Sequence, residues 1–219
     1  MSEMWNALLP EEKRIVTDNF TISNYKKNQI VYLENESPKN LWCLLKGKVK
    51  MYKVGIGDRV QILRLYSPVQ YFGYRAYFAK EKYVSSVAAV EESIVGSIPM
   101  EIVERLIQGN INLAMFFIHE LSRNLGGSDT KLVNLTQKHI RGRLADALLQ
   151  LEDNYGLEDD GATLRIYMSR EDLASLSNMT TANAIRTLAA FVSEKLILVD
   201  GRKIKLIDKE QLQRISKNG

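Results

Sequence analysis

The sequence predicts an α+β protein that combines an N-terminal β domain, one long helix and a C-terminal winged helix-turn-helix domain. Three patterns predict this class. Short alternating segments separated by turn signals run from Tyr25 to about Pro99. A heptad-like apolar run follows, and residues 169–207 then have the form helix, turn, helix and hairpin. We expect domain boundaries at 1–109, 110–139 and 140–219.

The N-terminal section contains many short strands at near-regular spacing, which favours a β-sandwich, roll or barrel over a parallel sheet. The turn signals between them are Glu34–Pro38, Lys46-Gly47, Gly55–Asp58, Ser67-Pro68 and Gly73.

The middle section is helical. A short helix is predicted from Pro99 to Gly109-Asn110. Beyond it, a mostly apolar seam with alternating spacings of three and four runs from Ile111 to His139, about 42 Å, with Ser128 as a small polar interruption. The seam residues expected to form the dimer contact are Ile118, Leu121, Leu125, Leu132 and Leu135. Such a helix needs a partner, and a second copy of the chain is the simplest one. The alternative is packing along the β domain, for which Met115, Phe116 and Phe117 are available.

The helix-turn-helix pattern begins at Ser169, a predicted N-cap with Asp172 as its capping-box partner. Asn178 suits the left-handed position of the turn, and Thr180 caps the second helix. Three residues supply the buried side of that helix: Ala184, Leu188 and Phe191. The opposite side carries Thr181, Asn183 and Arg186, which suit contacts with base edges and phosphates.

The predicted wing is a hairpin with Asp200-Gly201 as its turn signal and a basic run, Arg202-Lys203-Ile204-Lys205. Residues 140–219 hold 12 Lys/Arg and 12 Asp/Glu, so the positive charge is local rather than global. We expect the acidic loop around Glu158-Asp159-Asp160 to face away from a phosphate backbone. The core of this domain should include Leu144, Leu148 and Leu151, and residues 139–143 should form the hinge before it.

Composition excludes several functional classes. One cysteine, Cys43, rules out an internal disulfide framework and a Cys-ligated iron–sulfur cluster. No signal peptide or long apolar run is visible, so a cytoplasmic protein without membrane segments is expected. We find no Gly-rich phosphate loop, metal-ligand cluster or nucleophile with a base, which argues against an enzyme and a metal site.

Four motifs resemble those of the bacterial cyclic-AMP receptor protein/FNR superfamily (Crp/Fnr family) of transcription regulators, and the resemblance covers nearly the whole chain. They are the Gly47 turn in LLKGKVKMY, Phe72-Gly73, SREDLASL in the first motif helix, and the Asp200-Gly201-Arg202-Lys203-Ile204 wing. The resemblance implies a cyclic-nucleotide-binding-like β-roll (jelly roll) and a homodimer on two-fold-related double-stranded DNA. It also implies contact with RNA polymerase, in some members through a loop near residues 153–161. The expected DNA-binding residues are Ser169, Arg170, Thr180, Thr181, Ala182, Asn183, Arg186, Arg202 and Lys203.

The chain departs from the family at its effector pocket. Cyclic-nucleotide binders carry a Gly-Glu step for the ribose and an Arg-Ser pair for the phosphate, where this sequence has Gly73-Tyr74 and Val84-Ser85. Loss of the carboxylate and the guanidinium argues against ordinary cyclic-AMP binding. Arg75 either supplies a cation from another direction or is a solvated residue, and Ser128 keeps a polar group beside the expected ligand. The expected pocket residues are Gly73, Tyr74, Arg75, Ser85, Ser86, Ser128 and Asp129.

Two further points stay open in the sequence. Haem would need Cys43, His119 or His139 as an axial ligand, and none is in a favourable context, so haem is not expected. Relatives read their operator with an Arg-Glu-(x)₃-Arg set, which here becomes Thr181, Ala182 and Arg186. Arg186 fits either a guanine contact or a phosphate clamp or salt bridge.

The alternative function is a ligand-sensing scaffold whose winged helix binds protein, and the effector is not identified.

Overall fold

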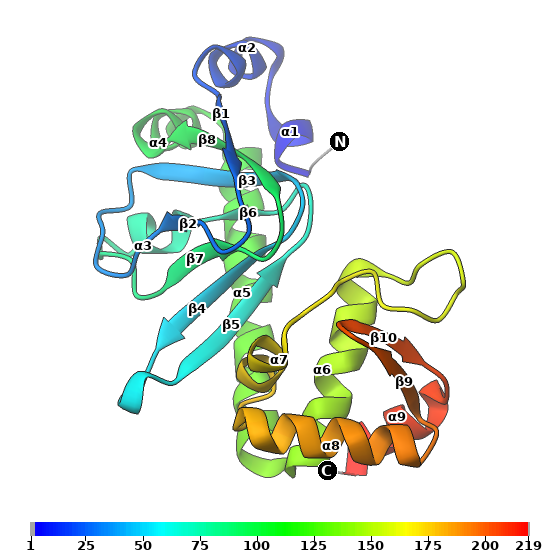
Figure 1. The fold of residues 1–219 in the computed structure, drawn as a ribbon. Helices are drawn as coiled ribbons and strands as arrows, with labels where there is room; N and C mark the ends of the chain where they lie inside the picture. The colour runs from blue at the N-terminus through cyan, green and yellow to red at the C-terminus, as the bar shows by residue number, and fades with distance from the viewer. Residues whose placement is uncertain (1–2, 219) are drawn as a thin grey trace. The chain divides into compact units, whose positions relative to one another are not determined.

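The computed structural model describes residues 3–218, which form two compact units (Figure 1). The first unit comprises residues 3–54 and 63–127, and the second comprises residues 55–62 and 128–218. The three-part domain division expected from the sequence stays a prediction.

The first unit is the β domain, and it is built from two four-stranded sheets with the orders β1-β8-β3-β6 and β2-β7-β4-β5. Neighbouring strands such as β1 and β8, or β4 and β7, pair in antiparallel fashion, which confirms the predicted N-terminal β domain. Its strands are β1 (Thr21–Tyr25), β2 (Ile30–Tyr32), β3 (Asn40–Lys46), β4 (Val49–Val54), β5 (Val60–Tyr66), β6 (Tyr71–Phe72), β7 (Ser86–Ala89) and β8 (Ser93–Pro99). The short helices are α1 (Glu3–Ala7), α2 (Pro10–Asp18), α3 (Tyr74–Phe78) and α4 (Met100–Gly109). A 3₁₀ turn, η1 (Ile56–Asp58), and the first three residues of β5 lie in the segment 55–62, which belongs to the second unit.

Two glycines of the predicted motifs occupy positions that a side chain could not share. Gly47 has φ +86°, and a Cβ there would lie 2.4 Å from Oγ of Ser93. Gly73 has φ +90°, and a Cβ there would lie 2.7 Å from Cδ1 of Trp42. Both positions therefore need glycine for its left-handed backbone and for space.

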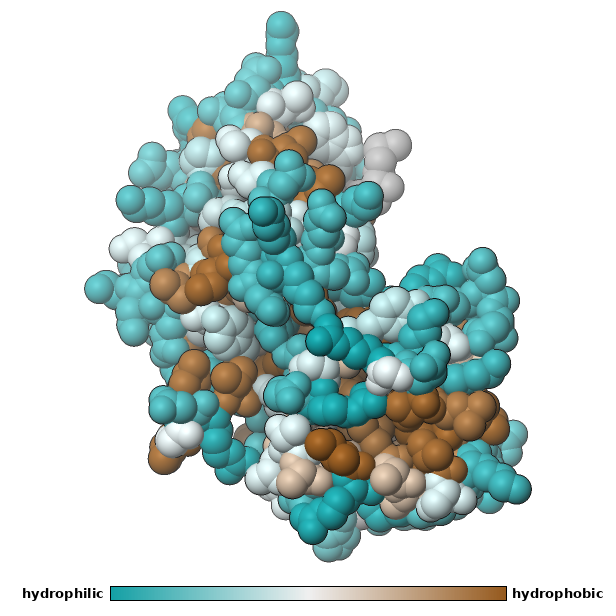
Figure 2. Space-filling view, in the orientation of Figure 1, coloured by the Kyte–Doolittle hydropathy of each residue, from teal (hydrophilic) through white to brown (hydrophobic). Residues whose placement is uncertain are grey.

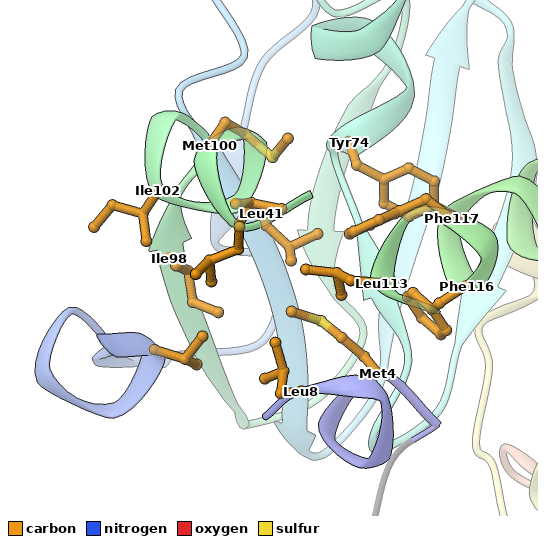
Figure 3. Packing of buried hydrophobic residues seen from close by; sticks show 13 residues of the cluster. Met4, Leu8, Leu41, Tyr74, Ile98, Met100, Ile102, Leu113, Phe116 and Phe117 are labelled. Atoms are coloured by element: carbon orange, nitrogen blue, oxygen red, sulfur yellow. The ribbon is translucent and has the colours of Figure 1, made fainter. Parts of the chain in front are cut away.

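A hydrophobic cluster joins the β domain to the long helix α5 (Ile111–Gln137) (Figure 3). Leu113, Phe116 and Phe117 of α5 are buried in it, beside Leu41 and Tyr74. The face of α5 that includes Phe116 and Phe117 thus packs on the β domain, as the sequence allowed.

Ile118, Leu125 and Leu132 of the expected seam lie on the exposed side of α5, a helix of 27 residues, whereas Leu121 packs against the hydrophobic cluster. Ile118 is 50% exposed, Leu125 is 65% exposed and Leu132 is 62% exposed, whereas Leu121 and Leu135 are partly buried. Although α5 is long, no helix within residues 3–218 is both long and apolar enough to cross a membrane.

The second unit surrounds α6 (Ile140–Tyr155), whose Leu144, Leu148 and Leu151 are buried as predicted (Figure 1). Its other elements are α7 (Arg170–Leu176), α8 (Thr181–Ser193), β9 (Ile197–Asp200), β10 (Lys203–Leu206) and α9 (Lys209–Asn218). This order confirms the winged helix-turn-helix. The sequence analysis did not predict α9, which packs on α6.

The hairpin turn differs from its prediction by one residue. Asp200 pairs with Lys203, so the two residues of the turn are Gly201 and Arg202, whereas Asp200-Gly201 was the expected signal. Gly201 supplies the positive φ of 56° that the turn requires, and Asp200 remains the last residue of β9.

Candidate nucleic-acid interface and effector pocket

The turn between α7 and α8 is fixed by local hydrogen bonds that the sequence predicted. Oγ of Ser169 accepts the Asp172 amide at 3.1 Å, and Oγ1 of Thr180 accepts the Asn183 amide at 3.2 Å. Asn178 adopts the left-handed conformation with φ 50°. These caps satisfy amides that would otherwise lack a partner, so Ser169 sets where α7 begins and Thr180 sets where α8 begins.

The buried side of α8 contains the predicted Ala184, Leu188 and Phe191, which turns Arg186 outward to an exposed position. Arg186 Nη2 donates to Oδ1 of Asn183 one turn earlier. Asn183 therefore braces the guanidinium through its carbonyl oxygen and keeps its amide NH₂ as a donor. The structure brings Thr181, Asn183 and Arg186 onto one end of the helix, where a major-groove reader needs them.

Contacts to neighbouring segments constrain the wing. Arg170 at the start of α7 donates from Nη2 to the Gly201 carbonyl at 2.8 Å, which ties the helix to the hairpin turn. Lys203 lies over the Tyr167 ring, with Nζ 5.6 Å from the centroid. Arg202 is exposed at the turn itself. The wing therefore presents Arg202 and Lys203 from a backbone that Arg170 holds.

One residue of the acidic loop, Asp160, is held against the wing. Asp160 Oδ2 and Lys205 Nζ of β10 form an ion pair at 3.1 Å, and Thr163 bridges to Lys205. The amide and hydroxyl of Thr163, the amide of Ala162 and then Lys205 all lower the pKa of Asp160 below its ordinary value. The β-bridge between Thr163 and Lys205 brings Asp160 to β10, and the expected orientation of the loop relative to a phosphate backbone stays a prediction.

The C-terminal end of α8 is held by a bidentate ion pair that sequence reasoning missed. Arg141 of α6 donates to the two carboxylate oxygens of Glu194 at 2.8 and 2.7 Å. The hydrogen bonds from Arg141 lower the pKa of Glu194. The Arg141 guanidinium also lies 5.1 Å from the Phe191 ring centroid. No spacing rule links residues so far apart in the chain.

Arg143 forms a second brace that the sequence did not reveal. Its guanidinium donates to the carbonyls of Lys138 and Ser177 at 3.0 Å each and of Asn178 at 3.1 Å. The junction before α6 is therefore fastened to the turn of the helix-turn-helix, and the hinge role of residues 139–143 stays a prediction.

Tyr74 is the central residue of the expected effector pocket, and it is buried. Its side chain points toward Phe117 of α5, with ring centroids 5.3 Å apart (Figure 3). Its hydroxyl accepts a hydrogen bond from Nδ2 of Asn124 at 2.9 Å. Burial is the largest cause that raises the pKa of Tyr74, so the phenol is neutral at physiological pH. Tyr74 therefore places a buried, neutral aromatic side chain at this position of the expected pocket, and its role there stays a prediction.

The second step of the pocket carries no guanidinium. Val84 is 45% exposed, and Ser85 and Ser86 are buried, with Oγ of Ser86 accepting the Glu34 amide at 2.9 Å. Lys53, which the sequence analysis overlooked, donates to the Val84 carbonyl at 3.0 Å and forms an ion pair with Glu34 at 2.7 Å.

Arg75 was expected to act as a pocket cation. In the structure its guanidinium forms an exposed ion pair with Glu81 at 3.1 Å. Ser128 and Asp129 are exposed on α5. The pocket roles of these three residues stay predictions.

The haem candidates are dispersed. Cys43 is buried in β3, where burial raises the pKa of its thiol to about 11, and His119 and His139 are exposed. Within the part of the chain that the structure describes, no three His, Cys, Asp or Glu side chains gather as a metal site would require.

Both halves of the chain match known domain families. Residues 22–110 match the cyclic nucleotide-binding domain, and residues 142–215 match the Crp-like helix-turn-helix domain. Together these two matches cover the β domain and the winged helix-turn-helix.

Similar proteins span nearly the same length. The chain is 25% identical over 213 residues to a CRP-like cAMP-activated global transcriptional regulator of Mycobacterium tuberculosis, covering 96% of this chain and 95% of the relative. It is 24% identical to the global nitrogen regulator of a Nostoc species, covering 84% and 83%. Among solved structures, FixK2 from Bradyrhizobium japonicum has a similar fold, with a TM-score of 0.81 at 20% identity over 90% of this chain and 96% of that one.

Proposed function

The chain belongs to the Crp/Fnr family of DNA-binding transcription regulators, and from this premise we propose that it binds a two-fold-related operator as a homodimer without cyclic AMP bound in the family's usual way. The family consists of transcription regulators, not enzymes. The proposed site of action is the cytoplasm, where the operator DNA lies.

The observation that carries the operator proposal is the outward face of α8. Arg186 is exposed and braced by Asn183, and the Thr180 cap that sets the start of α8 is formed. A guanidinium in this position can donate to O6 and N7 of guanine as a bidentate pair. Ser169, Arg170, Thr180, Thr181, Ala182, Asn183, Arg202 and Lys203 are proposed as the remaining DNA-contacting set.

The homodimer proposal rests on the exposed seam of α5. Ile118, Leu125 and Leu132 follow one another at intervals of seven residues, and each is at least half exposed. A continuous apolar stripe at heptad spacing is the surface that a parallel two-stranded coiled coil buries. A second copy supplies the same stripe, and its two-fold symmetry matches that of an inverted-repeat operator.

The effector proposal rests on Tyr74. The buried phenol, bonded to Asn124, offers no carboxylate for a ribose, and Val84 offers no guanidinium for a cyclic phosphate. The Mycobacterium relative is named as cAMP-activated, whereas the Nostoc relative is named for nitrogen regulation, so the relatives are not all named for one signal. We therefore propose DNA binding that cyclic AMP does not control.

Contact with RNA polymerase is proposed for the loop near residues 153–161. The side chain of Asp159 is fully exposed there, although Asp160 is held against Lys205. The alternative of a protein-binding winged helix has only the balanced charge of residues 140–219 in its favour.

Selection from a random DNA library, with the purified full-length protein and no added ligand, tests the operator proposal. The expected result is an inverted repeat whose half-sites lie about 10 base pairs apart, with a guanine in each half. Binding to the selected DNA should weaken steeply as the salt concentration rises. Recovery of no common sequence would contradict the proposal.

A further inference from the structure

An exposed isoleucine lies in the middle of the recognition helix. Ile185 is 50% exposed on α8, directly before Arg186, and its neighbours Ala182 and Ala189 are exposed as well. Figure 2 shows hydrophobic residues over α8 on the face that it displays. The outward surface of this helix is therefore largely apolar, with Arg186 as its exposed cation.

Neither folding nor local helix stability accounts for isoleucine at this position. The core side of α8 is formed by Ala184, Thr187, Leu188 and Phe191, so Ile185 adds little to the interior. A β-branched side chain also lowers helix propensity relative to alanine. A large apolar side chain that stays half exposed on a binding helix instead suits an apolar surface on the ligand.

DNA presents one apolar feature to a helix in the major groove. The 5-methyl group of thymine is the only hydrocarbon on a base edge there, whereas guanine, cytosine and adenine show donors and acceptors. Ala182 and Ala189, on the same exposed side as Ile185, have side chains of a single methyl group, which lets the helix backbone approach the bases closely.

We propose that Ile185 recognises a thymine methyl group in each half-site, next to the base that Arg186 contacts. The inference rests on the proposed operator binding and adds a specificity-determining residue to it. It commits the operator to a thymine whose methyl group, rather than its hydrogen-bonding groups, is required.

Replacement of single thymines by uracil tests the inference, because uracil lacks only the methyl group. The probe is the selected operator carrying one uracil at a time, and the readout is its dissociation constant at fixed salt. Loss of one buried methyl group should weaken binding by wild-type protein roughly threefold to fivefold at one thymine per half-site. Elsewhere in the half-site, uracil should have little effect.

The variant Ile185→Ala closes the cycle. It should bind the thymine operator about as weakly as wild-type protein binds the uracil operator, and it should no longer distinguish the two. Val192→Ala is the matched control, because Val192 is an apolar residue of the same helix, 36% exposed, close to its C-terminal end. This control and Arg186→Ala should both keep the uracil effect.

Three results would overturn the inference. Wild-type protein that binds its operator specifically yet tolerates uracil at every position has no methyl contact. A uracil effect that persists in Ile185→Ala belongs to another residue or to DNA shape. Failure to recover any operator in the initial selection would contradict the proposed function and this inference with it.

Discussion

The turn-and-recognition region of the second unit and the Tyr74 region of the first unit differ in whether their changed side chains face solvent or the protein interior. Around α8 the positioning residues Ser169, Thr180 and Asn178 keep their local geometry, and the changed side chains face solvent. Around α3 the changed residue, Tyr74, faces inward and packs on Phe117. We therefore expect the solvent-facing changes to alter which DNA is bound, and the inward-facing change to alter what the pocket can hold and how stable the domain is.

The largest effect is expected at the proposed dimer seam of α5. Leu125→Glu places a carboxylate on the proposed seam, where burial without a partner costs several kcal/mol. The protein should become monomeric by sedimentation, and operator affinity should fall on the order of 10³-fold, toward non-specific binding. His119→Glu, an exposed change on the same helix away from the seam, is the control. A dimeric Leu125→Glu protein would contradict the seam assignment.

Replacing Tyr74 should change the stability of the β domain. Tyr74→Ala removes a buried aromatic ring and should lower the free energy of unfolding of the β domain by about 3–5 kcal/mol. Tyr74→Phe loses only the hydrogen bond with Asn124 and should cost about 0.5–1.5 kcal/mol. Urea denaturation measures both, with exposed Arg75→Ala as a control that should cost less than about 1 kcal/mol. Equal effects for all three variants would show that Tyr74 is not a packing residue.

Replacing Arg186 should change DNA binding but not the stability of the fold. Arg186→Ala should weaken operator binding by about 1–3 kcal/mol, relax selectivity at one base position and leave urea denaturation unchanged. Asn183→Ala removes the brace of the guanidinium and should give a smaller loss at the same position. A uniform loss on all DNA sequences would instead identify Arg186 as a phosphate contact.

The smallest effect is expected at the Arg141–Glu194 pair. The pKa of Glu194 is lowered in the folded protein, so the pair stabilises the fold above its ordinary pKa of 4.5 and loses this contribution as pH falls below it. Both side chains are more than one third exposed, which limits the contribution to less than about 1 kcal/mol. Thermal unfolding of Glu194→Gln should match wild-type protein in acid and fall below it near pH 7. A difference that grows in acid would contradict this sign.

Local signals made the helix-turn-helix predictable. The helix caps, the left-handed Asn178 and the turn at Gly201 depend on residues within a few positions of each other, so they can be predicted from the local sequence. The position of Gly201 within the turn still differed by one residue, because Asp200 pairs as part of β9. The class of each half of the chain followed from such patterns.

Contacts between distant residues were not predictable in the same way. Arg143 donates to the carbonyl of Lys138, which precedes α6 in the chain, and to that of Ser177, which follows it. Lys53 of β4 donates to the carbonyl of Val84, 31 positions away. The ion pair of Asp160 with Lys205 depends on the β-bridge between Thr163 and Lys205, which joins residues far apart in the chain. Ile185 was not among the expected DNA-binding residues, because its half-exposed position depends on how α8 packs in the fold.

The most direct test of the account is the affinity for the selected operator with and without cyclic AMP. Fluorescence anisotropy of labelled operator, titrated with full-length protein at fixed salt, gives both dissociation constants. We expect specific binding without ligand and the same affinity when millimolar cyclic AMP is added. Binding that requires cyclic AMP, or that tightens tenfold or more on its addition, would contradict the proposal that Tyr74 has replaced the family's nucleotide contact.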